Sequence, residues 1–372
     1  MKRWLIGLVI GLVVVTAGGY AIYRQQGGLA GIVGAALPEF PDWPPPADRL
    51  ASGQQGHILF HSDTPFDLDV LLGDSALSRP TTAEGTLYLP DAASPASPVP
   101  AMVLLHGSGG LTPGREGGYA ELLTENGYAA FVLNYYTPRG VTEETPYMVR
   151  VLSTTEFDAI TDAYRALQIL HTHPDIDATR IGIMGFSYGG MAARFAMDGR
   201  IKQALIGDEP GFAAHVDYYG PCFQNLRSPS LTGAPILTLR GTEDASNDLA
   251  ACVVREAELR RGGVDVEAHV YEGAGHAWEA NRPRSLIEEA PYVTGCEVVY
   301  DERGHSFMGD TPIVSVPIET SREERVALRI ASGRVMADCV KSGYVIGRDD
   351  ATKSKSDAHL LGFLGRVLGG GG

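Results

Sequence analysis

The sequence predicts an α/β protein with a mostly parallel central sheet that is covered by helices on both faces. Short apolar runs predict buried strands at 101–105, 129–134, 180–184, 216–219, 236–239 and 266–271. Amphipathic helices are expected between them, the clearest being 154–171 and 249–261. An alternation of buried strands and helices favours parallel pairing, since each crossover needs a helix to return the chain to the same sheet edge.

The first part of the chain predicts a membrane segment. Lys2 and Arg3 precede the uncharged residues 4–23, and Arg24 ends the stretch. Twenty such residues can cross a bilayer as a helix, with the basic pair in the cytoplasm. A cleaved signal peptide is the alternative, because small residues at 15–19 offer cleavage positions. The first interpretation predicts a bacterial inner-membrane protein with a single span and a periplasmic domain. The second predicts a secreted or periplasmic protein.

The remainder is expected to form a linker and one domain. Residues 24–47 are rich in Gly and Pro, which predicts an extended linker. Residues 48–372 form the domain, and its first β-prone runs are 56–62, 66–72 and 82–89. After Ala280 the alternation weakens, so an insertion is expected at about 280–320. Helices are expected within 321–367, at 321–339 and 359–367.

Charge and composition exclude some functions. The net charge is −15 and no run of Lys and Arg interrupts it, which argues against a nucleic-acid partner. No CxxC motif or His/Cys cluster has the spacing of a metal site. No metal or organic cofactor is therefore expected. Composition says nothing about the oligomeric state.

The four cysteines are Cys222, Cys252, Cys296 and Cys339. In an oxidising compartment an even number of cysteines can form two bridges, here with three possible pairings. We favour Cys222–Cys252 and Cys296–Cys339, and four buried free thiols are the alternative.

A candidate nucleophile stands in Gly185-Phe186-Ser187-Tyr188-Gly189. The motif G-x-S-x-G is weak evidence alone, but here a predicted strand precedes it and a predicted helix follows. A strained strand-to-helix turn exposes the serine hydroxyl, and the helix N-terminus directs partial positive charge towards it. This context favours a nucleophilic Ser187 over a plain glycine turn with a serine cap.

A serine nucleophile needs a base and an acid, which follow it along the chain in this kind of site. His276 lies just beyond the strand 266–271, and Asp244 lies in the loop after the strand 236–239. Both should therefore reach the same sheet edge as Ser187. Glu243 and Asp248 are alternative acids. His305 is a weaker alternative base, because no clear strand of the sheet precedes it.

An oxyanion hole needs backbone N–H donors. One would be the N–H of Tyr188, directly after the nucleophile. The other should come from the loop after the strand 101–105, which contains His106-Gly107-Ser108-Gly109-Gly110 and is close to the HGGG type. Ser108 is the expected donor there.

These motifs, together with Asn126-Gly127-Tyr128-Ala129-Ala130, resemble the dienelactone hydrolase family from about residue 101 to 278. The spacing between Asp244 and His276 also looks right for it. The resemblance implies an α/β-hydrolase fold and hydrolysis of a carboxylic ester or lactone. It also implies a triad of Ser187, Asp244 and His276, with the amides of Ser108 and Tyr188 as oxyanion donors.

The chain departs from the enzymes that name the family. They use a cysteine nucleophile where this chain has Ser187, and a glutamate where it has Gly107. An arginine four residues beyond their histidine binds the substrate carboxylate, and Ala280 stands here. Arg139 resembles the family's other substrate-binding arginine. These departures argue against a dienelactone substrate and leave ester hydrolysis in general.

The sequence therefore predicts a serine hydrolase of small-molecule esters or lactones that works through an acyl-enzyme. A peptidase or thioesterase on the same scaffold is one alternative. A non-catalytic envelope binding protein is another, although a binder has no need of all three triad residues. The substrate pockets are expected from loop 137–146 and the segment after Ala280.

Overall fold

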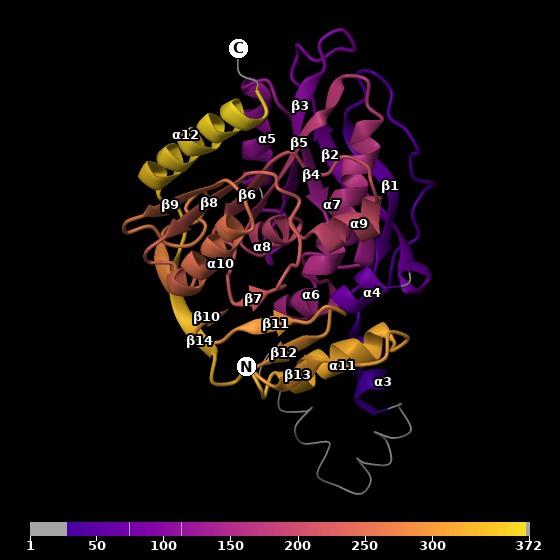
Figure 1. The fold of residues 1–372 in the computed structure, drawn as a ribbon, viewed down its shortest axis with the longest axis vertical. Coiled ribbons are helices and arrows are strands. Elements are labelled where there is room, and N and C mark those ends of the chain that lie inside the picture. The colour runs from indigo at the N-terminus through magenta and orange to yellow at the C-terminus, as the bar shows by residue number, and fades with distance from the viewer. Residues whose placement is uncertain (1–27, 74, 113, 370–372) are drawn as a thin grey trace, which may run out of the picture.

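The computed structural model describes residues 28–73, 75–112 and 114–369, and its centre is one eight-stranded sheet (Figure 1). The strand order is β1-β2-β4-β3-β5-β6-β8-β9. The pairs β1–β2 and β2–β4 are antiparallel, and every following pair is parallel. The predicted mostly parallel sheet is confirmed. Its strands are β1 (Gly56–Thr64), β2 (Arg79–Tyr88), β3 (Val99–Leu105), β4 (Ala129–Asn134), β5 (Ile176–Phe186), β6 (His215–Tyr218), β8 (Ile236–Gly241) and β9 (Val266–Tyr271).

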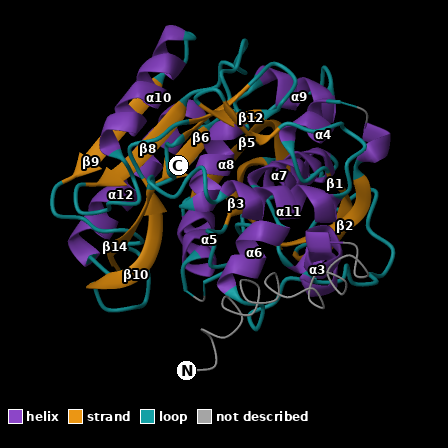
Figure 2. Ribbon diagram, turned by 90° about the horizontal axis from the view of Figure 1, so that it is seen from below, coloured by secondary structure: helices purple, strands orange, loops and turns teal. Residues whose placement is uncertain are grey.

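Helices cover both faces of this sheet, as Figure 2 shows. Successive side chains of the central strand β3 point to opposite faces, and all seven of its residues are buried. Val103 and Leu105 belong to the core beneath α7, whereas Met102 and Leu104 belong to the core beneath α5 and α12. The helices flanking the sheet are α5 (Glu116–Glu125), α7 (Glu156–His171), α8 (Tyr188–Phe195), α9 (Gly199–Ile206), α10 (Leu249–Arg261) and α12 (Asp350–Val367).

Two small sheets adjoin this core, and all of their strands except β7 come from the segment after β9 (Figure 1). β10 (Ser285–Val293) pairs with β14 (Val340–Ile346), and the second sheet has the order β13-β12-β11-β7. Its strands are β7 (Gln224–Asn225), β11 (Val298–Tyr300), β12 (Ser306–Met308) and β13 (Thr311–Val314). The other elements are α4 (Leu68–Leu72), η2 (Ser75–Leu77), η3 (Thr137–Arg139), α6 (Tyr147–Ser153) and α11 (Arg322–Ser332).

Four local expectations differ from the structure. The helix expected at 321–339 ends at Ser332 in α11, and β14 begins at Val340. Residues 66–72 form the short helix α4 rather than a strand, because Asp67 and Asp69 are held there by the distant Arg325. The expected linker 24–47 contains α3 (Gly28–Ala36), whose Val33 is buried in a small core with residues of α11. This part of the segment therefore packs on the domain. The second C-terminal helix is longer than expected, since Asp349 caps it at its start.

The predicted membrane segment, residues 4–23, lies outside the described residues. Within 28–73, 75–112 and 114–369, none of the helices is both long and apolar enough to span a membrane.

All four cysteines are paired in the structure. The bonds join Cys222 to Cys252 and Cys296 to Cys339, which are the pairs favoured from the sequence. Disulfides persist in oxidising compartments, so both bonds suit a location outside the cytoplasm.

We expect Gly185→Ala to destabilise the fold by about 3 kcal/mol, because overpacking a close backbone contact forces strands and helices apart. A Cβ at Gly185 would lie 2.1 Å from the carbonyl oxygen of Gly189. Gly117→Ala is the matched control: a Cβ there meets nothing within 4 Å, and alanine favours a helix. Urea unfolding of both variants checks this, and equal midpoints would contradict the packing argument.

We also expect acid to weaken the fold through two buried histidines. Burial lowers the pKa of His106 to about 3 and that of His215 to about 4. Below pH about 6.5 the unfolded chain therefore binds protons that the folded chain rejects. Each histidine then lowers the free energy of unfolding with a slope that approaches about 1.4 kcal/mol per pH unit as the pH falls well below 6.5. Urea midpoints between pH 7 and 5.5 measure the slope. His215→Leu should make the slope of the unfolding free energy against pH less steep, because one of the two histidines is gone. An unchanged slope would refute the contribution of His215.

Candidate active site

Ser187 occupies a sharp turn between β5 and α8 at the carboxyl edge of the sheet. Its φ of 54° is a left-handed backbone conformation that residues other than glycine rarely adopt. The flanking glycines make room for this turn. A Cβ at Gly189 would lie 2.4 Å from the carbonyl oxygen of His106, and one at Gly185 would collide with Gly189. The motif's two glycines are therefore steric requirements of the turn.

The loop 106–110 lies directly against this turn. A Cβ at Gly107 would be 3.4 Å from the Cβ of Ser187. Two tyrosine hydroxyls hold the loop's carbonyl groups: Tyr135 donates to His106 O at 2.7 Å, and Tyr136 donates to Ser108 O at 2.8 Å. The loop that carries the expected donor Ser108 is thus fixed beside Ser187. Tyr188 is the first residue of α8, where backbone N–H groups have no acceptor within the helix.

His276 and Asp244 meet beyond the ends of β9 and β8. Nδ1 of His276 lies 2.6 Å from Oδ2 of Asp244, and both residues are buried. A histidine bonded in this way through Nδ1 presents Nε2 as the free base. The end of β6 joins this pair to the serine turn: Ser187 N donates to Tyr218 O at 2.8 Å, and the ring centroids of Tyr219 and His276 are 4.5 Å apart.

The alternative acids and base lie elsewhere. Glu243 pairs with Arg284 at the surface. Asp248 caps α10 and accepts hydrogen bonds from the Thr294 hydroxyl and the Gly295 amide. Nδ1 of His305 lies 3.5 Å from Oδ2 of Asp301, in the connection between β11 and β12. Of the three candidate acids, Asp244 is the one that the structure brings to His276.

Backbone strain gathers around these residues. In the described part of the chain, five residues other than glycine have positive φ, and Ser187, Tyr219 and Ala277 are three of them. Ala277 directly follows His276 in the chain, and Tyr219 packs against the His276 ring. Strained conformations persist where the surrounding structure enforces them, and they concentrate at functional sites.

Sequence reasoning missed a buried acid beside this pair. Glu279 accepts a hydrogen bond from the Tyr219 hydroxyl, and the guanidinium of Arg115 lies 3.9 Å away. Burial raises the pKa of the Glu279 carboxyl, and Arg115 and Tyr219 act in the opposite direction. Arg115 also pairs with Glu116 at 2.5 Å. The sequence gives no signal for this cluster, since its members come from separate segments.

Sequence reasoning also missed the residues that hold Asp244. Ser246 donates from its amide and its hydroxyl to Oδ1 of Asp244, at 3.0 and 2.5 Å. Asn247 donates to Oδ2 at 2.9 Å. Both belong to the loop that leads into α10, and their only sequence signal is their closeness to Asp244.

The expectation for Arg139 needs correction. Its side chain has no exposed surface. The guanidinium is bonded to both oxygens of Asp162, at 2.6 and 3.1 Å, and to the backbone oxygens of Tyr135 and Asp63. A side chain enclosed in this way does not face a substrate, so Arg139 packs the domain together instead.

A cavity of about 370 Å³ opens beside the loop 106–110. It is lined by Gly109 and Gly110 from that loop, by Tyr136, and by residues of the expected pocket loop 137–146, including Val141. A larger cavity of about 620 Å³ lies between α8, β7 and α10, and neither cavity is lined by Ser187, Asp244 or His276. In the described residues, no group of His, Cys, Asp and Glu has the arrangement of a metal site.

The model of the dienelactone hydrolase family matches residues 84–329. No curated protein matches the chain.

Solved structures show similarity at low identity. A Klebsiella pneumoniae protein assigned to the dienelactone hydrolases is 22% identical, covers 60% of this chain and 88% of its own, and has a TM-score of 0.42. A dienelactone hydrolase-like phosphotriesterase from metagenomic libraries is 18% identical. The match covers 60% of this chain and 84% of that one, with a TM-score of 0.44. An esterase from Thermogutta terrifontis with bound propionate is 17% identical. The match covers 53% of this chain and 80% of that one, with a TM-score of 0.43.

The assignment rests on the family model, which spans more than half of the chain and covers β3, the Ser187 turn, Asp244 and His276. The protein belongs to the dienelactone hydrolase family and is a carboxylic ester hydrolase.

Proposed function

We propose that the protein hydrolyses carboxylic esters through an acyl-enzyme on Ser187, with His276 as the base and Asp244 as the acid. The observation that carries the proposal is the hydrogen bond between His276 and Asp244 beside the strained turn of Ser187. A serine hydroxyl is a poor nucleophile at neutral pH, and an adjacent base held in one tautomer by a carboxylate overcomes this.

In the first step Oγ of Ser187 attacks the acyl carbon while Nε2 of His276 takes its proton. The negative charge that develops on the carbonyl oxygen is stabilised by the N–H groups of Tyr188 and Ser108. His276 then gives the proton to the departing alcohol, and Asp244 stabilises the transient imidazolium. Water, deprotonated by His276, attacks the acyl group and releases the acid.

The cavity beside loop 106–110 is a suitable place for one side of the ester. It adjoins the loop that carries the proposed oxyanion donor Ser108, and it is lined by both apolar and polar groups, among them Val141, Tyr136 and Arg150. Its size of about 370 Å³ suits a small acyl or alcohol group rather than a polymer.

We expect a fluorophosphonate probe to form its adduct on Ser187 in the purified full-length protein, because it reacts with serines that an adjacent base activates. Ser187→Ala should abolish labelling and lower the hydrolysis of p-nitrophenyl acetate by at least about 10³-fold. Ser97→Ala, in an exposed loop, is the control and should behave as wild type. Peptide mass mapping locates the adduct. Labelling of a different residue, with full activity in Ser187→Ala, would refute the proposal.

We further propose that residues 4–23 remain as an uncleaved anchor and that the domain lies outside the cytoplasm. The two disulfides support an oxidising location. Helix α3, which starts only a few residues after this segment, packs against α11, so the domain would lie close to the membrane surface.

We expect the expressed protein to have the mass of the full chain, to sediment with membranes and to resist extraction at alkaline pH. A variant lacking residues 1–27 should be released into the soluble fraction, because it lacks the apolar segment. A mature N-terminus between residues 16 and 20 would instead establish cleavage and overturn the anchor.

A further inference from the structure

The candidate acid Asp244 is held through both of its oxygens. Oδ2 accepts hydrogen bonds from Nδ1 of His276 at 2.6 Å and from the side-chain amide of Asn247 at 2.9 Å. Oδ1 accepts hydrogen bonds from the amide and the hydroxyl of Ser246. Ser246 is the next residue but one to Asp244, and its hydroxyl also lies 3.1 Å from Nδ1 of His276. Asn247 makes further contacts with distant parts of the fold, and these distinguish it from Ser246.

The side-chain amide of Asn247 joins three segments. Its Nδ2 donates to Asp244 Oδ2 and also to Tyr219 O, at 2.7 Å, and its Oδ1 accepts from Nη1 of Arg240 at 2.8 Å. Arginine has donors only, so it must face the oxygen of the amide. Arg240 therefore fixes which way the Asn247 amide points, and with it the two donors towards Tyr219 and Asp244.

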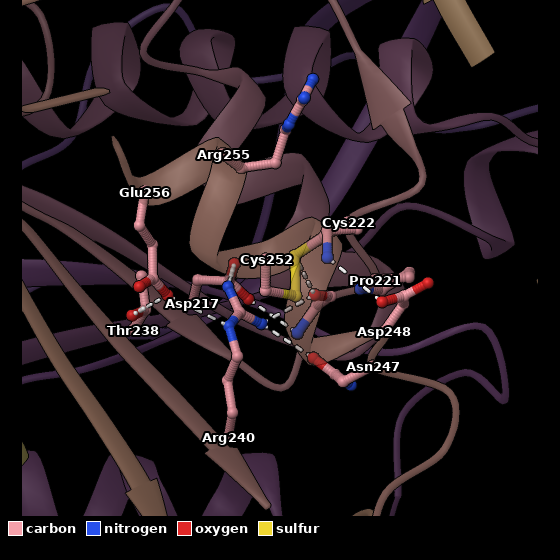
Figure 3. Close-up of a disulfide and its surroundings, with 12 residues drawn as sticks. Asp217, Pro221, Cys222, Thr238, Arg240, Asn247, Asp248, Cys252, Arg255 and Glu256 are labelled. Atoms are coloured by element: carbon pink, nitrogen blue, oxygen red, sulfur yellow. Dashed lines mark hydrogen bonds and ion pairs between the residues drawn. A yellow bond between two sulfur atoms is a disulfide. The ribbon is translucent and has the colours of Figure 1, made fainter. Parts of the chain in front are cut away.

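Arg240 is itself immobilised by a buried charge cluster, shown in Figure 3 together with Asn247. Only 1% of it is exposed. Its guanidinium donates to Asp217 at 3.0 Å, to Glu256 at 3.3 Å and to Gly220 O at 2.9 Å. Arg194 pairs with the same oxygen of Asp217. Two arginines thus face two carboxylates, and a buried charge that keeps its partners has little freedom to move.

The same contacts reach the nucleophile turn. Asn247 binds the carbonyl group of Tyr219, and the carbonyl group of the preceding residue, Tyr218, accepts the N–H of Ser187. The Cys222–Cys252 disulfide adds a covalent connection, because it joins the loop after β6 to α10, which follows Asn247 (Figure 3). The end of β6 is therefore the common support of the serine and the acid.

We propose that Asn247, oriented by Arg240, is a positioning residue that sets the Asp244–His276 pair relative to the Ser187 turn. This proposal rests on the proposed function of these three residues. Asn247 touches no reacting atom. It acts through Asp244, whose direction decides where the histidine ring presents Nε2.

The test is Asn247→Asp in the full-length protein, with Asn247→Ser as a second variant. Asn247→Asp keeps the size of the side chain and the oxygen facing Arg240, but replaces the donor to Asp244 with a second carboxylate. We expect kcat for p-nitrophenyl acetate to fall roughly 10- to 100-fold with KM within about twofold, because misorientation of a catalytic group affects the chemical step. Asn247→Ser is too short to bridge Tyr219 and Asp244, so kcat should fall there as well.

The pH profile separates positioning from loss of stability. An added negative charge near the proposed base favours the positively charged form of a neighbouring group. Since the base acts only when it is deprotonated, the acid limb of kcat/KM should move to higher pH in Asn247→Asp. A variant that is merely less stable would keep the wild-type limb.

Thr238→Val is the matched control. Thr238 is buried in the same cluster and donates to Glu256 at 2.8 Å, on the far side of Arg240 from Asp244. Its loss should lower the melting temperature while kcat and the acid limb stay as in wild type.

A measurement without turnover completes the test. Proton NMR of the His276 Nδ1–H bonded to Asp244 should give a strongly downfield signal in wild type and in Thr238→Val, and a shifted or missing signal in both Asn247 variants.

The two proposals fail in different ways. If wild type neither hydrolyses the ester nor labels at Ser187, the proposed function fails. If wild type is active, and the Asn247 variants match Thr238→Val in kcat, acid limb and downfield signal, the positioning role is overturned while the proposed function stands.

Discussion

The close packing of backbone at the carboxyl end of β5 is the constraint on which the candidate site depends. There the turn of Ser187 passes so near to His106 and to the first turn of α8 that two positions must be glycine. Parallel neighbours on both sides of β5 then bring the ends of β3 and β6 to the same edge. One steric fact therefore places the serine, the loop 106–110 and the support at Tyr218 and Tyr219 within reach of each other.

Such an edge carries strain and buried charge, and the surrounding structure offsets both. Ser187, Tyr219 and Ala277 hold unfavourable backbone conformations. Around them lie buried ion pairs rather than a purely apolar core, such as Arg240 with Asp217 and Arg115 with Glu116. Ion pairs of this kind contribute little net stability compared with hydrophobic packing, but they fix direction, because each guanidinium has defined donor positions. A site that needs fixed hydrogen-bond directions gains more from them than from apolar contacts.

Much of this arrangement could be predicted from the sequence, because it depends on short-range patterns. The strands β4 and β9 and the helix α10 appear at the expected boundaries, since buried apolar runs and amphipathic spacing are local signals. The order of Ser187, Asp244 and His276 is equally a property of the chain. Long-range contacts decide what could not be predicted. Arg325 turns the segment at Asp67 into a helix, and burial with Asp162 removes Arg139 from any substrate. Tyr219 and Glu279 carry no motif at all, because their partners come from distant segments, and Asn247 is marked only by its closeness to Asp244.

The contact between the histidine loop and β14 bears on how the molecule is completed during synthesis. His276 N donates to Val345 O at 2.7 Å, and Gly347 N donates to His276 O at 2.9 Å. The main sheet has all of its strands once β9 has been synthesised. The two backbone bonds to His276 can form only after β14 and Gly347 have also been synthesised. The strands of the main sheet and the backbone support of His276 are therefore completed at different times. A chain that stops before β14 would retain every strand of the main sheet but would lack both of these backbone bonds to His276, the proposed base.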